Sequence, residues 1–215
     1  MPEKSLIALV DDHPLVRRAL SDALRATFPG LEIATTATVE EALFSLRRRL
    51  SSPDIQRAWV LLDLGLPGLS GLAAIMALKA LDPRVTILTL SGSDDDLQVG
   101  ACLGCGSYGF ISKGAPIEDL LAVVTDAIHG RLLKGTWLSS VGLRDSQTLE
   151  KLALTERQLQ VLSMVCQGKT NRQIADGLGI TEITAKAHIG AIFRTLKVSS
   201  RTQAVLVAQR IGAAL

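Results

Sequence analysis

The sequence has no long hydrophobic run and few cysteines. No apolar stretch approaches the roughly 18 residues of a membrane-spanning helix, because even the uncharged segment Leu97–Ser112 is interrupted by Gly and Ser. The N-terminal apolar run, Leu6–Val10, is too short for a signal peptide. Three cysteines are an odd number, which argues against a disulfide scaffold and fits a reducing cytoplasm. These absences exclude membrane, secreted and disulfide-stapled classes and predict a cytoplasmic protein.

The sequence also lacks the composition of a disordered chain, since 47% of its 215 residues are hydrophobic and 20% are charged. Its charges are divided unevenly. Residues 1–150 carry 14 Lys/Arg and 18 Asp/Glu, a balance of −4, whereas residues 151–215 carry 9 and 3, a balance of +6. This division predicts two domains, of which the basic one is a candidate for binding polyanions.

Short apolar runs alternate with helix signals in the acidic part. The predicted strands are Leu6–Val10, Ile33–Thr35, Val60–Leu62, Val85–Leu90 and Tyr108–Ile111. Helix starts are indicated by Pro14, a capping-box pattern at Thr38–Glu41, Ser70 and Pro116. The helices that these signals predict are Pro14–Phe28, Ala42–Leu50, Gly71–Leu81, Asp95–Leu103 and Ile117–His129. Five strand–helix units in sequence predict an α/β fold with a doubly wound parallel sheet.

Residues 131–153 lose this alternation and are predicted to be a linker, with a short helix around Asp145–Leu152. The linker separates a first domain over residues 1–130 from a second over residues 154–215. The stretch Ser51–Trp59 is predicted to form a loop that bulges away from the ligand crevice.

Acidic residues stand where strands of the first domain end. Asp11 and Asp12 follow the first strand, Asp63 ends the third, and Lys113 follows the fifth. Ligands of such folds bind outside the carboxyl ends of the strands. Three converging carboxylates repel one another unless a cation joins them, and hard oxygen ligands suit Mg²⁺. A carboxylate can also accept a phosphoryl group, and a nearby Lys would neutralise it.

Four segments with these residues, Val10–Pro14, Leu61–Gly68, Leu90–Gly92 and Gly109–Lys113, resemble the receiver domain of two-component response regulators. The resemblance covers roughly Ser5–Gly130 and implies a flavodoxin-like fold. It implies a set of roles: phosphorylation of Asp63; metal binding by Asp11, Asp12, Asp63 and the main-chain carbonyl of Gly65; phosphoryl binding by Lys113; and a switch pair of Ser91 and Phe110.

The basic part has a purely helical pattern with glycine turns. Helical segments are predicted to begin at Thr155, Thr170 and Thr181. The last of them is the helix Glu182–Lys197, whose apolar face contains Ala185 and Ile192. Two helices around a Gly-containing turn in a basic domain indicate a helix-turn-helix.

The segments Leu154–Arg157, Gly168–Ala175, Thr184–His188 and Arg201–Ala204 resemble the LuxR/NarL-type helix-turn-helix over Leu154–Ile211. The resemblance implies DNA contacts and a dimer contact at Arg201–Arg210. The implied DNA-contacting residues are Thr181, Thr184, Lys186, Ala187 and His188. Further along the exposed face of the same helix, Arg194 and Lys197 are predicted to contact phosphates. Gln158, Ala185 and Gly190 depart from the family pattern, which usually has Glu, Val and a polar or basic residue there.

Together the two resemblances predict a NarL/FixJ-type transcriptional regulator rather than an enzyme. A sensor histidine kinase would phosphorylate Asp63, and a homodimer would bind double-stranded DNA. Two alternatives stay open: a DNA-binding regulator controlled without phosphorylation, and a Mg²⁺-dependent phosphatase. The phosphatase is disfavoured because Gly65, not an acid, stands two residues after Asp63.

The sequence leaves two smaller questions. His13 is interpreted as opening the first helix rather than binding metal, because Mg²⁺ disfavours imidazole. Cys102 and Cys105 form a C-x-x-C pattern without the strand-to-helix setting of a thioredoxin-like motif. They are interpreted as packing residues, with redox sensing as the alternative.

Overall fold

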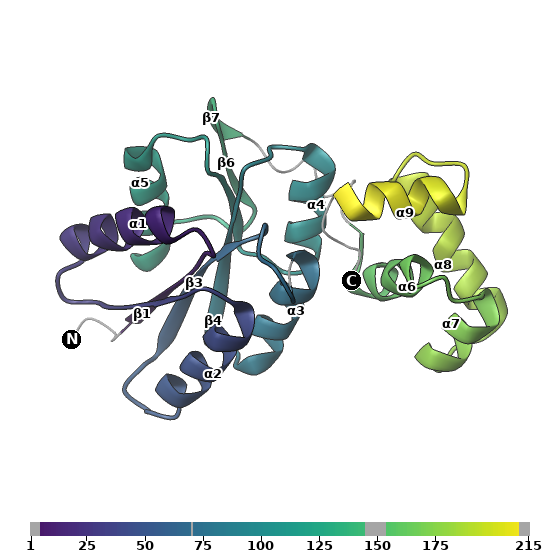
Figure 1. Cartoon of the computed structure of the whole chain (residues 1–215), viewed down its shortest axis with the longest axis horizontal. Coiled ribbons are helices and arrows are strands. Elements are labelled where there is room, and N and C mark those ends of the chain that lie inside the picture. The colour runs from purple at the N-terminus through teal and green to yellow at the C-terminus, as the bar shows by residue number, and fades with distance from the viewer. Residues whose placement is uncertain (1–4, 70, 145–153, 211–215) are drawn as a thin grey trace.

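The computed structural model describes residues 5–69, 71–144 and 154–210. A twisted sheet with helices on both faces forms the first part, and a group of helices forms the second (Figure 1). Within the described residues, no helix has the length and apolar character required to cross a bilayer.

Five strands follow the predicted apolar runs: β1 (Ser5–Val10), β2 (Glu32–Thr36), β3 (Arg57–Asp63), β4 (Val85–Ser91) and β5 (Gly109–Ser112). They pair in parallel in the order β2-β1-β3-β4-β5. The predicted doubly wound sheet is therefore confirmed. The central strands are buried on both faces, which is why they read as continuous apolar runs.

The predicted helices also form: α1 (Pro14–Thr27), α2 (Val39–Leu50), α3 (Gly71–Leu81), α4 (Asp96–Gly104) and α5 (Ile117–Ile128). Two apolar clusters pack on the two faces of the sheet. One contains residues of α1 and α5, and the other contains residues of α2, α3 and α4. The predicted Ser70 cap lies outside the described residues.

The capping box predicted at Thr38–Glu41 forms only in part. The Thr38 hydroxyl accepts the Glu41 N–H, but the Glu41 carboxylate accepts the N–H of Ala37 instead of that of Thr38. The connection after α2 lies at the opposite end of β3 from Asp63, as predicted, but it is shorter than predicted because Arg57–Trp59 belong to β3. Arg84 anchors it by donating to the carbonyls of Leu50 and Ile55.

The sheet does not stop where the sequence predicts a linker. Within residues 131–153, two further strands form, β6 (Thr136–Ser139) and β7 (Gly142–Arg144). β6 pairs in parallel with β5, and β7 pairs antiparallel with β6. The prediction of a linker is therefore wrong for the residues of β6 and β7. The helix predicted around Asp145–Leu152 lies outside the described residues.

The β6–β7 hairpin is tied to the loop before α4. The Asp94 carboxylate accepts hydrogen bonds from the N–H and the hydroxyl of Ser140, at 2.9 and 2.7 Å. Trp137, on β6, is only 3% exposed. The close β5–β6 approach requires a glycine, because a Cβ at Gly109 would lie 2.9 Å from the Thr136 carbonyl oxygen.

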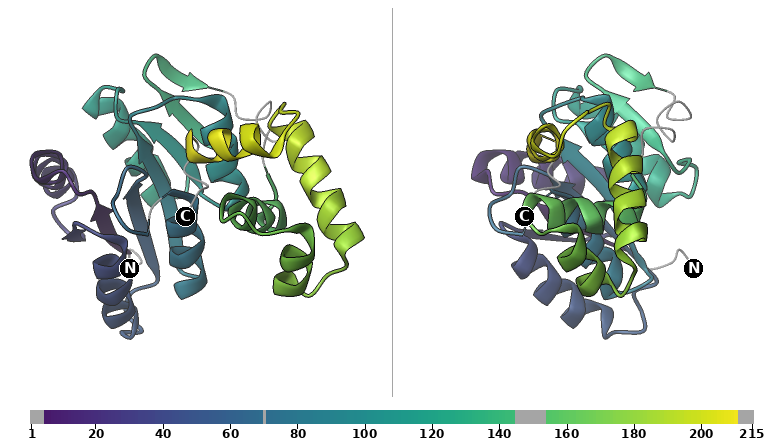
Figure 2. Two further views of the ribbon diagram at one scale, coloured as in Figure 1. Left: turned by 45° about the vertical axis from the view of Figure 1, so that its right-hand side comes forward. Right: turned by 90° about the vertical axis from the view of Figure 1, so that its right-hand side faces the viewer.

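Four helices form the second part: α6 (Glu156–Cys166), α7 (Asn171–Leu178), α8 (Glu182–Thr195) and α9 (Arg201–Arg210). Gly179 ends α7 in the left-handed region, at φ 63°, which permits the sharp turn into α8. The predicted helix-turn-helix is confirmed. α8 lies on the side of this domain away from the sheet (Figures 1 and 2).

Candidate functional site

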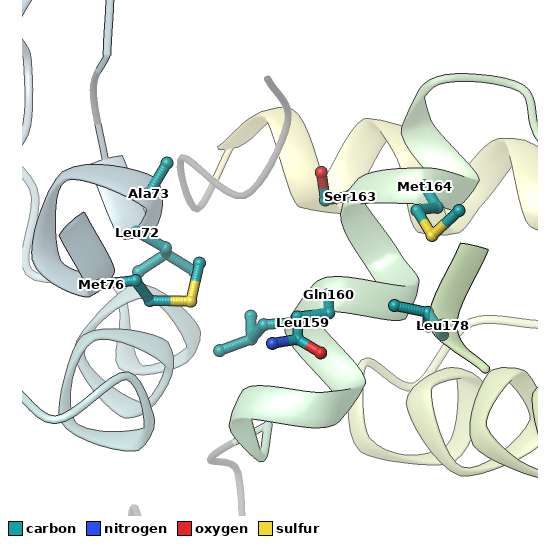
Figure 3. A pocket seen from close by; sticks show the side chains of 8 residues that line it. All are labelled: Leu72, Ala73, Met76, Leu159, Gln160, Ser163, Met164 and Leu178. Carbon is teal, nitrogen blue, oxygen red and sulfur yellow. The ribbon is translucent and has the colours of Figure 1, made fainter. Parts of the chain in front are cut away.

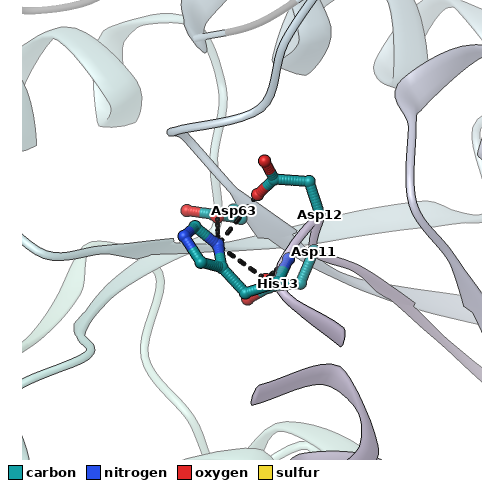
Figure 4. Close-up of side chains that lie close together, drawn as sticks. All are labelled: Asp11, Asp12, His13 and Asp63. Atoms are coloured by element: carbon teal, nitrogen blue, oxygen red, sulfur yellow. Dashed lines mark hydrogen bonds and ion pairs between the residues drawn. The ribbon is translucent and has the colours of Figure 1, made fainter. Parts of the chain in front are cut away.

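An acidic pocket forms at the carboxyl ends of β1 and β3. Carboxylate oxygens of Asp11, Asp12 and Asp63 lie within 4.8 Å of one another and of a His13 ring nitrogen (Figure 4). Asp11 is fully buried and Asp63 is 3% exposed. The predicted convergence of the three carboxylates is present because parallel strands end at the same edge of the sheet.

Lys113 compensates part of this negative charge. Its Nζ lies 2.7 Å from Asp11 Oδ2 and 2.8 Å from Asp63 Oδ2. Burial by itself lowers the pKa of Lys113, but hydrogen bonds and charge interactions with the two carboxylates outweigh it and raise the pKa above its ordinary value. The ammonium group is therefore charged and held between the two buried acids.

His13 makes more contacts with the acidic residues than the sequence predicts. It is the N-cap of α1, as predicted, and its ring, 62% exposed, also lies beside the three carboxylates. The Nδ1 atom lies 2.9 Å from Asp12 Oδ1, 3.3 Å from Asp11 Oδ1 and 3.9 Å from Asp63 Oδ2. The sequence signal for these contacts is that His13 directly follows Asp11 and Asp12.

The residues present fit a hard divalent cation. Asp12 Oδ1 is buried and accepts no hydrogen bond within the described part of the chain, although the His13 ring lies beside it. Three carboxylates supply the oxygen ligands that Mg²⁺ prefers. Gly65 lies next to this group, since its N–H donates to Asp63 Oδ1 at 3.1 Å.

The predicted switch residues lie on neighbouring strands. Ser91 ends β4, and its hydroxyl donates to Gln98 Oε1 at 3.1 Å, on the α4 side. Phe110 lies on β5, is fully buried, and is in register with Trp137 of β6. The structure therefore shows the Ser91 hydroxyl bound to α4 rather than to Asp63.

Cys102 and Cys105 are both buried. Burial raises the pKa of Cys102 well above its ordinary value, and burial and then the charge of Glu156 raise that of Cys105 to about 12. Buried thiols of high pKa react slowly. This environment fits the packing interpretation.

The predicted DNA-contacting residues lie on or beside α8, and most are exposed. Thr181, Thr184, Lys186, Ala187 and Arg194 are exposed, whereas His188 is half-buried. The Thr181 hydroxyl accepts the N–H of Thr184 and lies 2.8 Å from its hydroxyl, so both side chains serve the helix cap.

Lys197 requires a correction, because the sequence placed it on the recognition helix. α8 ends at Thr195, and Lys197 follows it in the left-handed region at φ 53°. It is exposed just beyond the helix. The helix ends before its predicted limit because the left-handed residue stops the helical repeat.

The departures from the family pattern keep the local structure. Gln158 completes a capping box with Thr155, since its side chain accepts the Thr155 N–H at 2.8 Å and the Thr155 hydroxyl accepts the Gln158 N–H. Ala185 is fully buried on the packed face of α8. Neither residue disturbs the helix-turn-helix.

The two domains meet at a small apolar pocket between α3 and the helices α6 and α7 (Figure 3). Apolar side chains dominate its lining, and Gln160 and Ser163 are the polar exceptions. The lining residues are Leu72, Ala73, Met76, Leu159, Gln160, Ser163, Met164 and Leu178. The contact leaves the exposed face of α8 outside the pocket.

Known proteins match both parts of the chain. The family model "Response regulator receiver domain" matches residues 7–125, and "Bacterial regulatory proteins, luxR family" matches residues 152–208. The "Glycerol metabolism activator" of Pseudomonas putida is 34% identical over 212 residues, which cover 94% of each chain. The "Nitrate/nitrite response regulator protein NarP" of Escherichia coli is 34% identical and covers 99% of this chain and 100% of its own.

Solved structures share the fold. RcsB from Salmonella enterica serovar Typhimurium, bound to promoter rprA in the presence of the phosphomimetic BeF3-, has a TM-score of 0.58 at 20% identity. The likeness covers 93% of this chain and 96% of that one. A structure of two RcsB dimers bound to two parallel DNAs has a TM-score of 0.56 at 21% identity, with 95% and 97% coverage.

Proposed function

We infer the chemistry of the acidic pocket from one premise: this chain belongs to the NarL/FixJ family of response regulators, in which a receiver domain precedes a LuxR-type DNA-binding domain. It is a DNA-binding transcriptional regulator. Our proposal is that Asp63 accepts the phosphoryl group that controls it. The observation that supports this choice is the position of Asp63 at the end of β3, where Lys113 contacts both it and Asp11.

Mg²⁺ would be held by Asp11, Asp12, Asp63 and the main-chain carbonyl of Gly65. When bound, the ion would neutralise the carboxylates and the developing charge on phosphoryl oxygens. The free lone pairs of Asp12 Oδ1 and the oxygen-rich donor set support this assignment. His13 lies against the same oxygens, so its ring would have to move aside.

The transfer step uses the Asp63 carboxylate as the nucleophile. A carboxylate oxygen forms a bond to phosphorus, and the bond between phosphorus and the donor breaks, leaving its electron pair on the donor. The donor would be a phosphohistidine of a sensor kinase or a small acyl phosphate. Lys113, already 2.8 Å from Asp63 Oδ2, is placed to contact the transferred phosphoryl group.

The new phosphoryl group would change the partner of Ser91. Its hydroxyl is bonded to Gln98 of α4 and would exchange that partner for a phosphoryl oxygen. Phe110, buried on the next strand, would report the change. A shift between these two arrangements would alter the contact between the domains and favour a homodimer on double-stranded DNA.

Phosphorylation by acetyl phosphate, followed by intact mass, tests the assignment. The wild-type chain should gain one phosphoryl mass with Mg²⁺ and none with EDTA. Asp63→Asn should abolish labelling, whereas Asp22→Asn, at an exposed acid of α1, should leave it unchanged. Full labelling of Asp63→Asn would contradict the proposal, and labelling in EDTA would contradict the role of the metal.

A further inference from the structure

Ile183 is an exposed apolar residue at the start of the recognition helix. It is the second residue of α8, and 83% of its surface is exposed. The buried side chains of α8, among them Ala185 and Ile192, fix which face of the helix points outward. Ile183 therefore points into solvent because of how α8 packs. Packing in the core gives no reason for a large apolar side chain at this position.

The neighbours of Ile183 define a surface suited to DNA. Ala187 lies one turn further along the same exposed face, and Gly190 one turn beyond it. A Cβ at Gly190 would meet only the Arg194 guanidinium, at 3.7 Å, so the helix is open there. Exposed Lys186 and Arg194 supply positive charge beside these residues, which complements the phosphates of a nucleic acid.

The polar groups nearest to Ile183 are already engaged. The hydroxyls of Thr181 and Thr184 lie 2.8 Å apart, and Thr181 also accepts the Thr184 N–H. Both hydroxyls therefore take part in the cap of α8. Residues at the N-terminal end of a recognition helix meet base edges in the major groove, and Ile183 is the large apolar side chain at that end.

We propose that Ile183 reads thymine by packing against its C5-methyl group in the major groove. That methyl group is the apolar feature of the groove, and it distinguishes thymine from the other bases. A β-branched side chain on a helix has one strongly preferred χ1 rotamer, so little rotamer freedom is lost on contact. This inference rests on the proposed function, because it requires that α8 enters the major groove.

Uracil-substituted DNA tests the contact directly. The full-length chain, treated with acetyl phosphate and Mg²⁺, first selects its preferred duplex from a randomised library. The selected duplex is then synthesised with thymine or with deoxyuridine, which lacks only the methyl group. The wild-type chain should lose about fourfold in affinity for each methyl group that the contact buries.

Variants assign the effect to Ile183. Ile183→Ala should bind the thymine and uracil duplexes equally, while Ile183→Val should keep part of the preference for thymine. Leu143→Ala, which removes an exposed apolar side chain from β7, should behave like the wild-type chain. Circular dichroism checks that each variant is folded.

The outcomes separate this inference from the one on which it rests. Equal methyl sensitivity in wild-type and Ile183→Ala chains would overturn the role of Ile183, and so would a wild-type chain that is indifferent to uracil. A library from which no sequence is enriched would contradict sequence-specific DNA binding itself, and the inference with it.

Discussion

In the receiver domain the candidate residues are buried and contact one another, whereas in the helical domain they are exposed on and beside α8. Asp11 and Asp63 are nearly inaccessible, and Lys113 lies within hydrogen-bond distance of both. Lys186 and Arg194 are exposed to solvent. The residues of the receiver site therefore contact one another without a ligand, whereas the exposed residues of α8 would make their contacts with a bound partner.

This difference in burial determines how much each site indicates about its ligand. Buried charges must be compensated, so the buried carboxylates support the proposed cation and the proposed phosphoryl site. An exposed basic helix satisfies its groups with water and is compatible with many partners. Its partner is then inferred from the chemistry of its exposed side chains, such as that of Ile183.

The largest effect concerns how far the buried region of the receiver extends. Trp137→Ala should lower the free energy of unfolding by about 3–5 kcal/mol, because it removes a buried aromatic side chain. Leu143→Ala, at an exposed position of β7, should change it by less than ~0.5 kcal/mol.

Urea unfolding followed by tryptophan fluorescence measures this loss. Trp59 and Trp137 are the two tryptophans of the chain and both lie in the sheet, so the signal reports the receiver alone. Similar small losses in both variants would show that the hairpin is not part of the receiver core.

The second effect concerns the metal. A ligand that binds only the folded state stabilises it by about 2.7 kcal/mol at 100 times its Kd. Mg²⁺ should therefore raise the unfolding midpoint of the receiver, while EDTA should lower it. Asp11→Asn should weaken the response. A sodium salt at the same ionic strength is the control, and an equal response to Na⁺ would argue against a specific site.

The third effect compares two lysines of the DNA-binding domain. If Lys186 contacts a base edge, Lys186→Ala should weaken specific binding by roughly 1–3 kcal/mol. Lys197, beyond the end of α8, should contact phosphate, so that Lys197→Ala weakens all sequences alike and lowers the salt slope by about one.

Titrations of the selected and a scrambled duplex at two salt concentrations separate these roles. If Lys186→Ala weakened both duplexes equally, Lys186 would be a phosphate contact and the assignment of base reading to it would be wrong.

The smallest effect concerns a carboxylate near the surface, in contrast to the buried acids. A side-chain hydrogen bond from Arg84 is the main cause that lowers the pKa of Asp82 from 3.8 to about 2. Because the folded state has the lower pKa, this stabilisation is present above pH 4 and is lost as the pH falls towards 2.

The magnitude should stay below about 1 kcal/mol because the pair is partly solvated. Unfolding of the wild-type chain and of Asp82→Asn, measured between pH 2 and 5, isolates this contribution. A pH dependence that is identical in the two chains would assign the effect to other carboxylates.

Much of the receiver could be predicted from the sequence. β1 and β3 read as continuous apolar runs because both of their faces are covered, and Asp11 and Asp63 follow them at the edge where parallel strands meet ligands. The helix-turn-helix is equally local, since Thr170 and Gly179 begin and end α7 within a few residues. These features depend on neighbours along the chain.

Other features depended on contacts between distant segments. β6 is stabilised by pairing with β5, and that pairing depends on the missing side chain at Gly109 rather than on any apolar run in residues 131–153. The hydrogen bond of Ser91 to Gln98 likewise depended on how α4 packs on the sheet.

Because periodicity, caps and turn residues act locally, they were enough to predict the two folds, their order and the residue types at the strand ends. Tertiary packing, in contrast, places the His13 ring beside the carboxylates of Asp11, Asp12 and Asp63. The physical reason is that the direction of a side chain depends on the packing of its helix against the rest of the molecule, which local sequence constrains only weakly.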